Sequence, residues 1–297
     1  MIPKYIKKSE DLVTIRDDIK NGFLFQAIKK GEISEKIVER AKDFYIALEK
    51  VKTVDDVLSL DKFYNELCAA AGLSQKSLSH LLEKDVKEIM IKVFHRVIKN
   101  SNTSFREEIV YRYLITAGDS IGGSMRNIIG SVAGEKLNIE LLKRLRQKGY
   151  KPKITQNQNG KAQSIQWGNR YIIFDHKPKL IEKNIDLILI NTKGLKEYDK
   201  NIFNDGSRYL ACGELKGGID PAGADEHWKT ANSALERIRV KFKKIKNKPG
   251  LFFIGTAIEI AMAKEIFKQL KNGKLSHAAN FNNEKQVKDL IEWLINL

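Results

Sequence analysis

Glu214 and Lys216, separated by one residue at the end of a short apolar run, could together serve phosphate-ester chemistry. Side chains alternate between the two faces of a strand, so these two point the same way while Leu215 faces the core. A carboxylate can hold a divalent cation, and an ammonium can stabilise the negative charge that develops on phosphorus. The pair therefore indicates a metal-dependent phosphodiesterase site at the end of a strand.

A second acidic residue interrupts an apolar stretch upstream. Residues 185–190 are typical of a buried strand, and Asp186 is the one charged residue among them. A carboxylate is costly at such a place without a partner or a cation. Asp186 and Glu214 are therefore candidate metal ligands and catalytic residues, with Lys216 positioning the attacking water. A structural ion pair of the two acids with Lys216 is the alternative.

The chain resembles the PD-(D/E)XK nucleases, and among them the AvaI/BsoBI-like type II restriction endonucleases, most closely over residues 186–230. Asp186 corresponds to the first acid of that family, and residues 214–216 correspond to its E-x-K element. Residues 217–228 look like the signature of the subfamily. The resemblance implies site-specific hydrolysis of double-stranded DNA with Mg²⁺, for which Mn²⁺ should be able to substitute.

The same resemblance implies further site residues and partners. His227 is expected near the scissile phosphate as a catalytic assistant, and Asp220 is expected to approach a base edge. Lys229, which follows the signature, is a further candidate for DNA contact. The resemblance also implies a homodimer, whose twofold symmetry would match a palindromic site. A cognate DNA methyltransferase is implied as a functional partner, not a physical one.

A glycine-rich passage gives a second set of DNA-contact candidates. Gly118–Gly123 predicts a tight loop that can approach a phosphate closely, followed by a helix over residues 124–148. The passage looks similar to one that precedes the nuclease core in relatives of the family. Arg126 and Asn127 are therefore candidates for DNA binding, and Glu135 for an extra acid near the metal. An ordinary glycine-rich helix entry is the alternative.

Other motifs are weaker candidates for a site. Asp175 and Lys177 form a looser triplet, but Lys177 precedes Pro178, which predicts a turn rather than a strand end. Cys212 is expected to be a small core residue and not a catalytic thiol. The remaining histidines do not have the spacing of zinc ligands, so a zinc site is not expected: His80, His95, His176 and His277.

Composition agrees with a polyanionic partner. The 297 residues include 53 Lys and Arg against 37 Asp and Glu, which gives a net charge of +16 and predicts salt-dependent binding to nucleic acid. The two cysteines do not imply a disulfide framework and fit a reducing cytoplasm. No apolar run approaches the length of a membrane span, and the N-terminus lacks a signal-peptide core. We therefore expect a cytoplasmic protein without a membrane partner.

The elements that must position these residues fall into two predicted regions. Residues 1–104 show helical spacing of apolar residues and predict an all-helical region, in which Ser74 could cap a helix and residues 70–78 invite a helix-turn-helix interpretation. Helical hairpins that only pack are the commoner alternative. Residues 105–297 predict the nuclease core with its C-terminal helices. Strands are expected at 171–175, 185–190, 209–216 and 251–257, and the helices that follow the signature at about 228–242, 258–271 and 284–296.

Strands interleaved with helices predict an α/β fold, a mixed central sheet flanked by helices as in restriction endonucleases, preceded by the all-helical region. The function predicted for it is that of a type II restriction endonuclease. One alternative is a nuclease of the same superfamily that acts in repair or recombination. A non-catalytic DNA-binding protein is another, but the intact set of Asp186, Glu214 and Lys216 argues against it.

Overall fold

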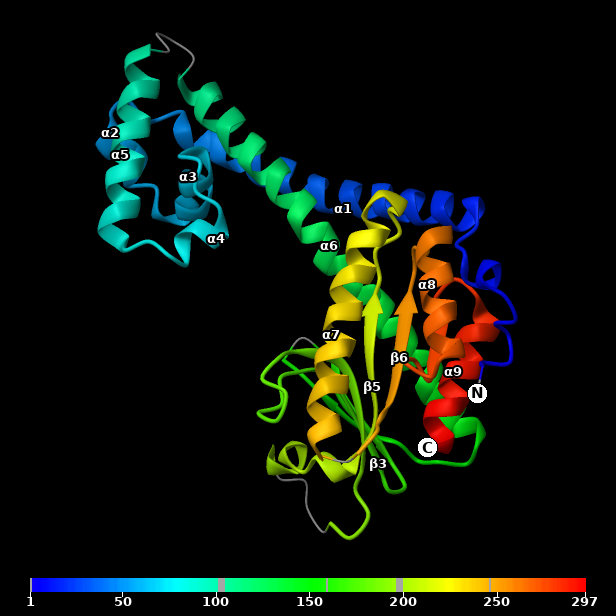
Figure 1. Ribbon diagram of the computed structural model, residues 1–297. Coiled ribbons are helices and arrows are strands. Elements are labelled where there is room, and N and C mark those ends of the chain that lie inside the picture. The colour runs from blue at the N-terminus through cyan, green and yellow to red at the C-terminus, as the bar shows by residue number, and fades with distance from the viewer. Residues whose placement is uncertain (1, 101–104, 159, 196–199, 246) are drawn as a thin grey trace. The chain divides into compact units, whose positions relative to one another are not determined.

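The computed structural model describes residues 2–100, 105–158, 160–195, 200–245 and 247–297 (Figure 1). By its internal contacts, the chain divides into two compact units. The sheet unit comprises residues 1–23 and 128–297, and the helical unit comprises residues 24–127. Sequence analysis places the division at residue 105, whereas by contacts residues 1–23 group with the sheet and residues 105–127 group with the helices.

The sheet unit is built on seven strands whose spatial order follows the sequence. Pairing is antiparallel from β1 through β5 and parallel from β5 through β7, so the sheet is mixed. This confirms the predicted α/β class. The strands are β1 (Lys153–Gln156), β2 (Ala162–Trp167), β3 (Arg170–His176), β4 (Ile185–Asn191), β5 (Tyr209–Lys216), β6 (Gly250–Gly255) and β7 (His277–Asn280).

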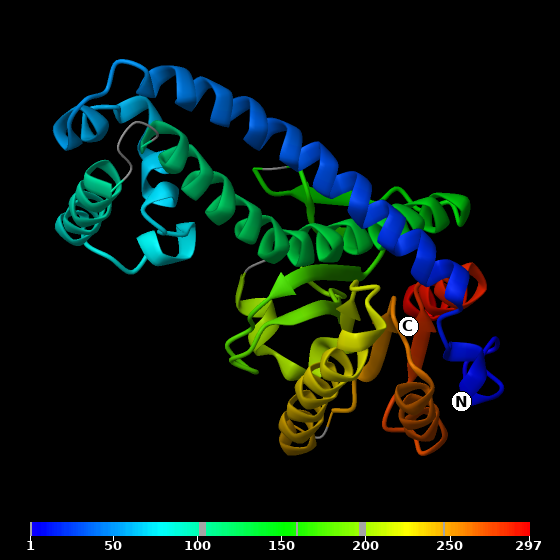
Figure 2. The same cartoon turned by 90° about the horizontal axis from the view of Figure 1, so that it is seen from above.

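Helices cover both faces of this sheet. On one face, α7 (Ala224–Ile245) and α8 (Ile260–Lys271) pack on side chains such as Cys212 and Phe253. On the other face, α9 (Glu284–Asn296) and the part of α6 that begins at Ile128 pack on side chains such as Phe252. Figure 2 shows α7 and α8, in yellow and orange, on the side of the strands opposite to the green α6. The central strands are therefore buried on both faces, which explains their continuous apolar runs.

α6 runs without a break over Phe105–Gln147, so the predicted loop at Gly118–Gly123 and the predicted helix start at Ser124 are wrong. None of the glycines in that passage has a positive φ, although each costs about 1 kcal/mol relative to alanine within a helix. The hydroxyl groups of Ser120 and Ser124 donate to carbonyl groups four residues earlier. These hydroxyls thus bond within the helix instead of capping its start.

The helical unit confirms the predicted all-helical region. Its core gathers side chains from every long helix of the unit, including Phe44, Phe94 and Ile109. Ser74 caps α4 as expected by accepting a hydrogen bond from the backbone of Ser77. However, α4 is one turn long, which is too short for the recognition helix of a helix-turn-helix. The helices are α1 (Arg16–Leu48), α2 (Val54–Leu58), α3 (Tyr64–Ala70), α4 (Gln75–Leu78), α5 (Glu83–Asn100) and the first part of α6.

Short 3-10 helices connect these elements: η1 (Ser9–Leu12), η2 (Asp61–Phe63), η3 (Lys200–Asn204), η4 (Gly206–Arg208) and η5 (Pro221–Gly223). Among the helices within the described ranges, none combines the length and the apolar character needed to cross a lipid bilayer.

Candidate active site

The predicted acids and lysine meet where β4 and β5 pair. Asp186 is the second residue of β4, and β5 ends with Glu214 and Lys216. The antiparallel register pairs Leu187 with Gly213, which sets Asp186 beside Glu214. These three charged residues are called the site cluster below. Strand pleating alone predicts the shared face of Glu214 and Lys216, and the strand register adds Asp186.

Lys216 bridges the two carboxylates of the site cluster. Its Nζ lies 3.0 Å from Oδ2 of Asp186 and 2.8 Å from Oε2 of Glu214. Asp186 Oδ2 also accepts a hydrogen bond of 2.8 Å from the backbone nitrogen of Leu215. Burial lowers the pKa of Lys216, but the two carboxylates outweigh burial and leave that pKa raised. The lysine is therefore held as a cation.

Glu214 is the least satisfied member of the site cluster. It is 4% exposed, and its Oε1 is a buried oxygen for which the described residues supply no hydrogen-bond partner. Burial, followed by the charge of Asp186, raises the pKa of Glu214 to about 7. An unpaired buried acceptor is costly, so the site cluster is one positive partner short of balance.

The donor atoms of the site cluster fit a hard divalent cation. Such ions prefer carboxylate oxygens, and Glu214 Oε1 is one that lacks a partner among the described residues. Within the described ranges, no three His, Cys, Asp or Glu side chains are grouped so that they could hold a metal ion. Asp186 and Glu214 would therefore hold the ion together with water or substrate oxygens, as is usual for Mg²⁺.

Asp175 is an acid beside the site cluster that sequence reasoning set aside. β3 pairs with β4 so that Phe174 faces Leu187 and His176 faces Ile185, which places Asp175 opposite Asp186. Asp175 is exposed as a whole residue, but neighbouring atoms crowd its carboxylate. Burial, followed by the charge of Asp186, raises the pKa of Asp175.

The predicted turn after Asp175 does end β3, and the exposed Lys177 lies beyond the strand. Lys177 therefore does not share a strand end with Asp175 in the way that Lys216 shares one with Glu214. The signal that could have found Asp175 is register. Two antiparallel strands that are joined by a short connection bring the last residues of the first strand beside the first residues of the second.

The signature segment folds back toward the end of β5. Asp220 is exposed and caps η5 by accepting a 3.0 Å hydrogen bond from the backbone of Ala222. His227 lies in the first turn of α7 and is half-buried. Its ring packs on Gly218, where a Cβ atom would meet the imidazole Cε1 at 2.8 Å. The imidazole therefore lies against the backbone two residues beyond Lys216.

Lys229, Asn127 and Arg126 are the other DNA-contact candidates. Lys229 is exposed and forms an ion pair of 2.5 Å with Asp225 on α7. Asn127 is exposed and belongs to the helical unit, as does Arg126, whose side chain lies outside the described residues. DNA contact by these three residues stays a prediction. Glu135 is exposed and accepts a hydrogen bond from Ser131, and its expected place near a metal stays a prediction.

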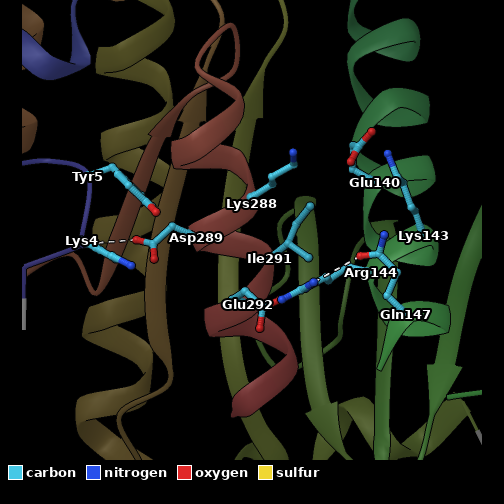
Figure 3. Close-up of a pocket in the computed structure, with 10 residues that line it drawn as sticks. All are labelled: Lys4, Tyr5, Glu140, Lys143, Arg144, Gln147, Lys288, Asp289, Ile291 and Glu292. Atoms are coloured by element: carbon cyan, nitrogen blue, oxygen red, sulfur yellow. Dashed lines mark hydrogen bonds and ion pairs between the residues drawn. The ribbon is translucent and has the colours of Figure 1, made fainter. Parts of the chain in front are cut away.

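A pocket of about 420 Å³ lies elsewhere in the sheet unit, between α6, α9 and the N-terminal segment (Figure 3). The backbone nitrogen of Lys4 donates to Asp289, and Arg144 forms an ion pair with Glu292. Two of its charged side chains are thus paired with each other. None of the predicted site residues lines this pocket, which leaves the site cluster as the candidate active site.

Comparison with known proteins gives matches along the whole chain. The model of the family described as "Restriction endonuclease BsobI" matches residues 3–165 and 152–297. The type II restriction enzyme AvaI, from Nostoc sp. and from Anabaena variabilis, is 37% identical over 311 residues, which cover 99% of this chain and 98% of AvaI. The type II restriction enzyme BsoBI of Geobacillus stearothermophilus is 36% identical over 314 residues, which cover 99% of this chain and 97% of BsoBI.

Proposed function

The chain belongs to the BsoBI family of restriction endonucleases, and on this premise we propose that it is a type II site-specific deoxyribonuclease. It hydrolyses phosphodiester bonds of double-stranded DNA at a short specific sequence, with Mg²⁺ as its cofactor. The net charge of +16 supports a polyanionic substrate, because basic side chains that meet phosphates release counterions.

The observation that carries this proposal is that the site cluster contains a buried oxygen without a hydrogen-bond partner among the described residues. Two carboxylates share one lysine, and Glu214 Oε1 is buried without a partner among the described residues. A buried ion pair with a purely structural role offsets its desolvation cost only if hydrogen bonds satisfy its remaining buried atoms. The arrangement therefore favours a cation site over a structural role, and a nuclease over a DNA-binding protein that has lost catalysis.

Each member of the site cluster has its own role in this proposal. When it is bound, Mg²⁺ supplies Lewis-acid polarisation of the phosphate and makes a water more acidic. Asp186 and Glu214 hold the ion with their carboxylate oxygens. Lys216, a cation 3.0 Å from one acid and 2.8 Å from the other, orients the attacking water and stabilises the charge that develops on phosphorus.

Residues of the signature segment act on the DNA in this proposal. His227 approaches the scissile phosphate from the start of α7, where its ring packs on Gly218 beyond the end of β5. The exposed Asp220 reads a base edge, and Lys229 contacts the backbone after it leaves its exposed partner Asp225. Exposed ion pairs of this kind contribute little to stability, so that exchange is cheap.

Arg126 and Asn127 are proposed as further DNA contacts on α6. The functional form is a homodimer, since a palindromic site requires matching twofold symmetry. Mn²⁺ substitutes for Mg²⁺, because both ions accept carboxylate and water ligands. A cognate methyltransferase protects the host sequence without binding this chain, and both proteins act in the cytoplasm.

Digestion of plasmid and phage DNA in magnesium buffer tests the proposal. Wild type is compared with Glu214→Ala, with a chelator control, and with Glu182→Ala, which changes an exposed acid on the β3–β4 connection. We expect discrete fragments that share one end sequence, produced by wild type and Glu182→Ala alone. Smearing or end-dependent loss would instead indicate a repair-type nuclease. DNA that is retarded on a gel but never cut with any divalent metal would contradict catalysis.

A further inference from the structure

The β3–β4 pairing places a third carboxylate beside the two that are proposed to hold the metal. Antiparallel pairing of Phe174 with Leu187 and of His176 with Ile185 brackets Asp175 and sets it across from Asp186. The two carboxylates are close enough for the charge of Asp186 to raise the pKa of Asp175. Asp175 and Asp186 thus form a cross-strand pair of like charge.

Such a pair is unfavourable unless positive charge compensates it. Lys216 is the cation of the site cluster, and its Nζ already bonds to both Asp186 and Glu214. The Asn184 side chain lowers the pKa of Asp175, but burial and the charge of Asp186 outweigh it. Three carboxylates therefore gather around one bonded ammonium group, and Lys161 has only the weakest influence on Asp175, so carboxylates are in surplus.

Two further features indicate that the surplus serves a ligand. Glu214 is 4% exposed, and its Oε1 has no hydrogen-bond partner among the described residues. This buried oxygen could therefore accept a bond from a cation. Asp175 also has a φ of 48°, a left-handed conformation that few residues other than glycine adopt. The unpaired oxygen is the observation that indicates a cation, and the backbone keeps Asp175 at the edge of the same site.

We propose that Asp175 is a third carboxylate of the cation site and strengthens divalent-metal binding through its charge, as a positioning residue and not as a direct ligand. No three acidic or histidine side chains in the described part of the chain converge at ligand distance, which is why the role is indirect. The inference rests on the proposed function, since it assigns Asp175 to the metal held by Asp186 and Glu214.

Mn²⁺ binding to the full chain without DNA tests the inference, measured by electron paramagnetic resonance of the free ion. Asp175→Asn keeps the shape of the side chain and suits a left-handed φ, so it removes the charge and little else. Glu182→Gln is the matched control, because Glu182 is also an exposed acid with positive φ, at 61°, and lies on the connection that follows β3. Asp186→Asn tests the metal site itself.

We expect Asp175→Asn to weaken Mn²⁺ binding about tenfold, Glu182→Gln to change it less than about twofold, and Asp186→Asn to abolish it. Asp175→Gly removes the charge and also relaxes the backbone, so it should show the same tenfold loss. It replaces Asp175→Asn in the test if that variant does not fold. Binding by both Asp175 variants equal to that of Glu182→Gln would overturn the inference and leave the metal site standing. Binding that is unaffected by Asp186→Asn would overturn the proposed metal site as well.

Discussion

Two polar clusters of the sheet unit differ in how completely their hydrogen bonds are made. The site cluster is charged, and its Glu214 Oε1 has no partner among the described residues. The β7 network, formed by Thr14, Asn280 and Gln286, is neutral and buried throughout, whereas in the site cluster Glu214 is buried and Asp186 and Lys216 are half-buried. Asn280 donates to Thr14 and to the carbonyl group of Leu12, and its own backbone nitrogen donates to Gln286.

The remaining groups of the β7 network are satisfied as well. Thr14 donates to the carbonyl group of Thr256, and Gln286 donates to that of Asp11. None of the side-chain atoms of these three residues is among the buried atoms without partners in the described chain. The network ties the N-terminal segment to β7 and to α9. A satisfied neutral network therefore stabilises the fold, whereas an unsatisfied charged cluster costs stability, a cost that the proposed metal site would explain.

The largest effect is expected from Glu214→Gln. The amide keeps the size of the side chain but is a poor ligand for Mg²⁺, so DNA cleavage should fall by about a thousandfold or more. The stability of the metal-free protein should not fall, because a buried charge has been removed. Initial rates on plasmid DNA and urea denaturation midpoints measure the two quantities. Cleavage within tenfold of wild type would remove Glu214 from the metal site.

Asn280→Ala should give the opposite pattern. Removing the amide leaves the carbonyl group of Leu12 and the hydroxyl group of Thr14 without that donor, which should lower the free energy of unfolding by about 2–3 kcal/mol. The cleavage rate per folded molecule should stay within about twofold of wild type. Urea denaturation and plasmid cleavage at a temperature where the variant is folded provide the check. Lost cleavage with intact stability would contradict the structural role of the network.

The two clusters should also differ in how they affect the pH dependence of stability. Since the folded protein raises the pKa of Glu214 from 4.5 to about 7, it retains a proton that the unfolded chain releases. In a chelator, the contribution of Glu214 to stability should therefore fall as pH rises from about 5 to 7.5, by on the order of 2 kcal/mol. Glu214→Gln should remove this fall and Asn280→Ala should keep it. Equal slopes for wild type and Glu214→Gln would show that Glu214 does not titrate in this range.

The smallest predicted effect concerns the placement of His227. A Cβ at Gly218 would lie 2.8 Å from the imidazole, whereas one at Gly223 would lie at an ordinary 3.8 Å. Gly218→Ala should slow cleavage about tenfold by displacing the ring, and the matched change Gly223→Ala should not. In a His227→Ala background, Gly218→Ala should have no further effect on the rate, because no ring remains to be displaced. Additive losses in the double variant would mean that Gly218 acts on something other than His227.

The difference between the site cluster and the β7 network also explains which residues could be predicted from the sequence. Glu214 and Lys216 were identified because strand alternation is a local property, and Asp186 because a lone charge in an apolar run is conspicuous. Asp175 was set aside because its place beside Asp186 depends on the register between β3 and β4, which is not local. The β7 network was missed, because Thr14 and Asn280 meet only after the chain has folded.

The fold shows the same limit. β3 to β6 were predicted from their apolar runs, whereas β1, which is exposed along its whole length, and the four-residue β7 lack such a signal. α6 was interrupted in the prediction, because glycine was taken to break a helix that its other residues sustain. Apolar runs in the sequence thus predict the central strands. The edge strands and the full length of α6 cannot be predicted from such runs.

The central claim is that the site cluster is a cation site. The most direct test is the anomalous scattering of Mn²⁺ in crystals of the wild-type protein soaked with the metal. The account predicts a peak about 2–2.5 Å from Oε1 of Glu214 and from a carboxylate oxygen of Asp186. A structure in which Lys216 still bridges both carboxylates, with Mn²⁺ absent there or bound only elsewhere, would contradict it.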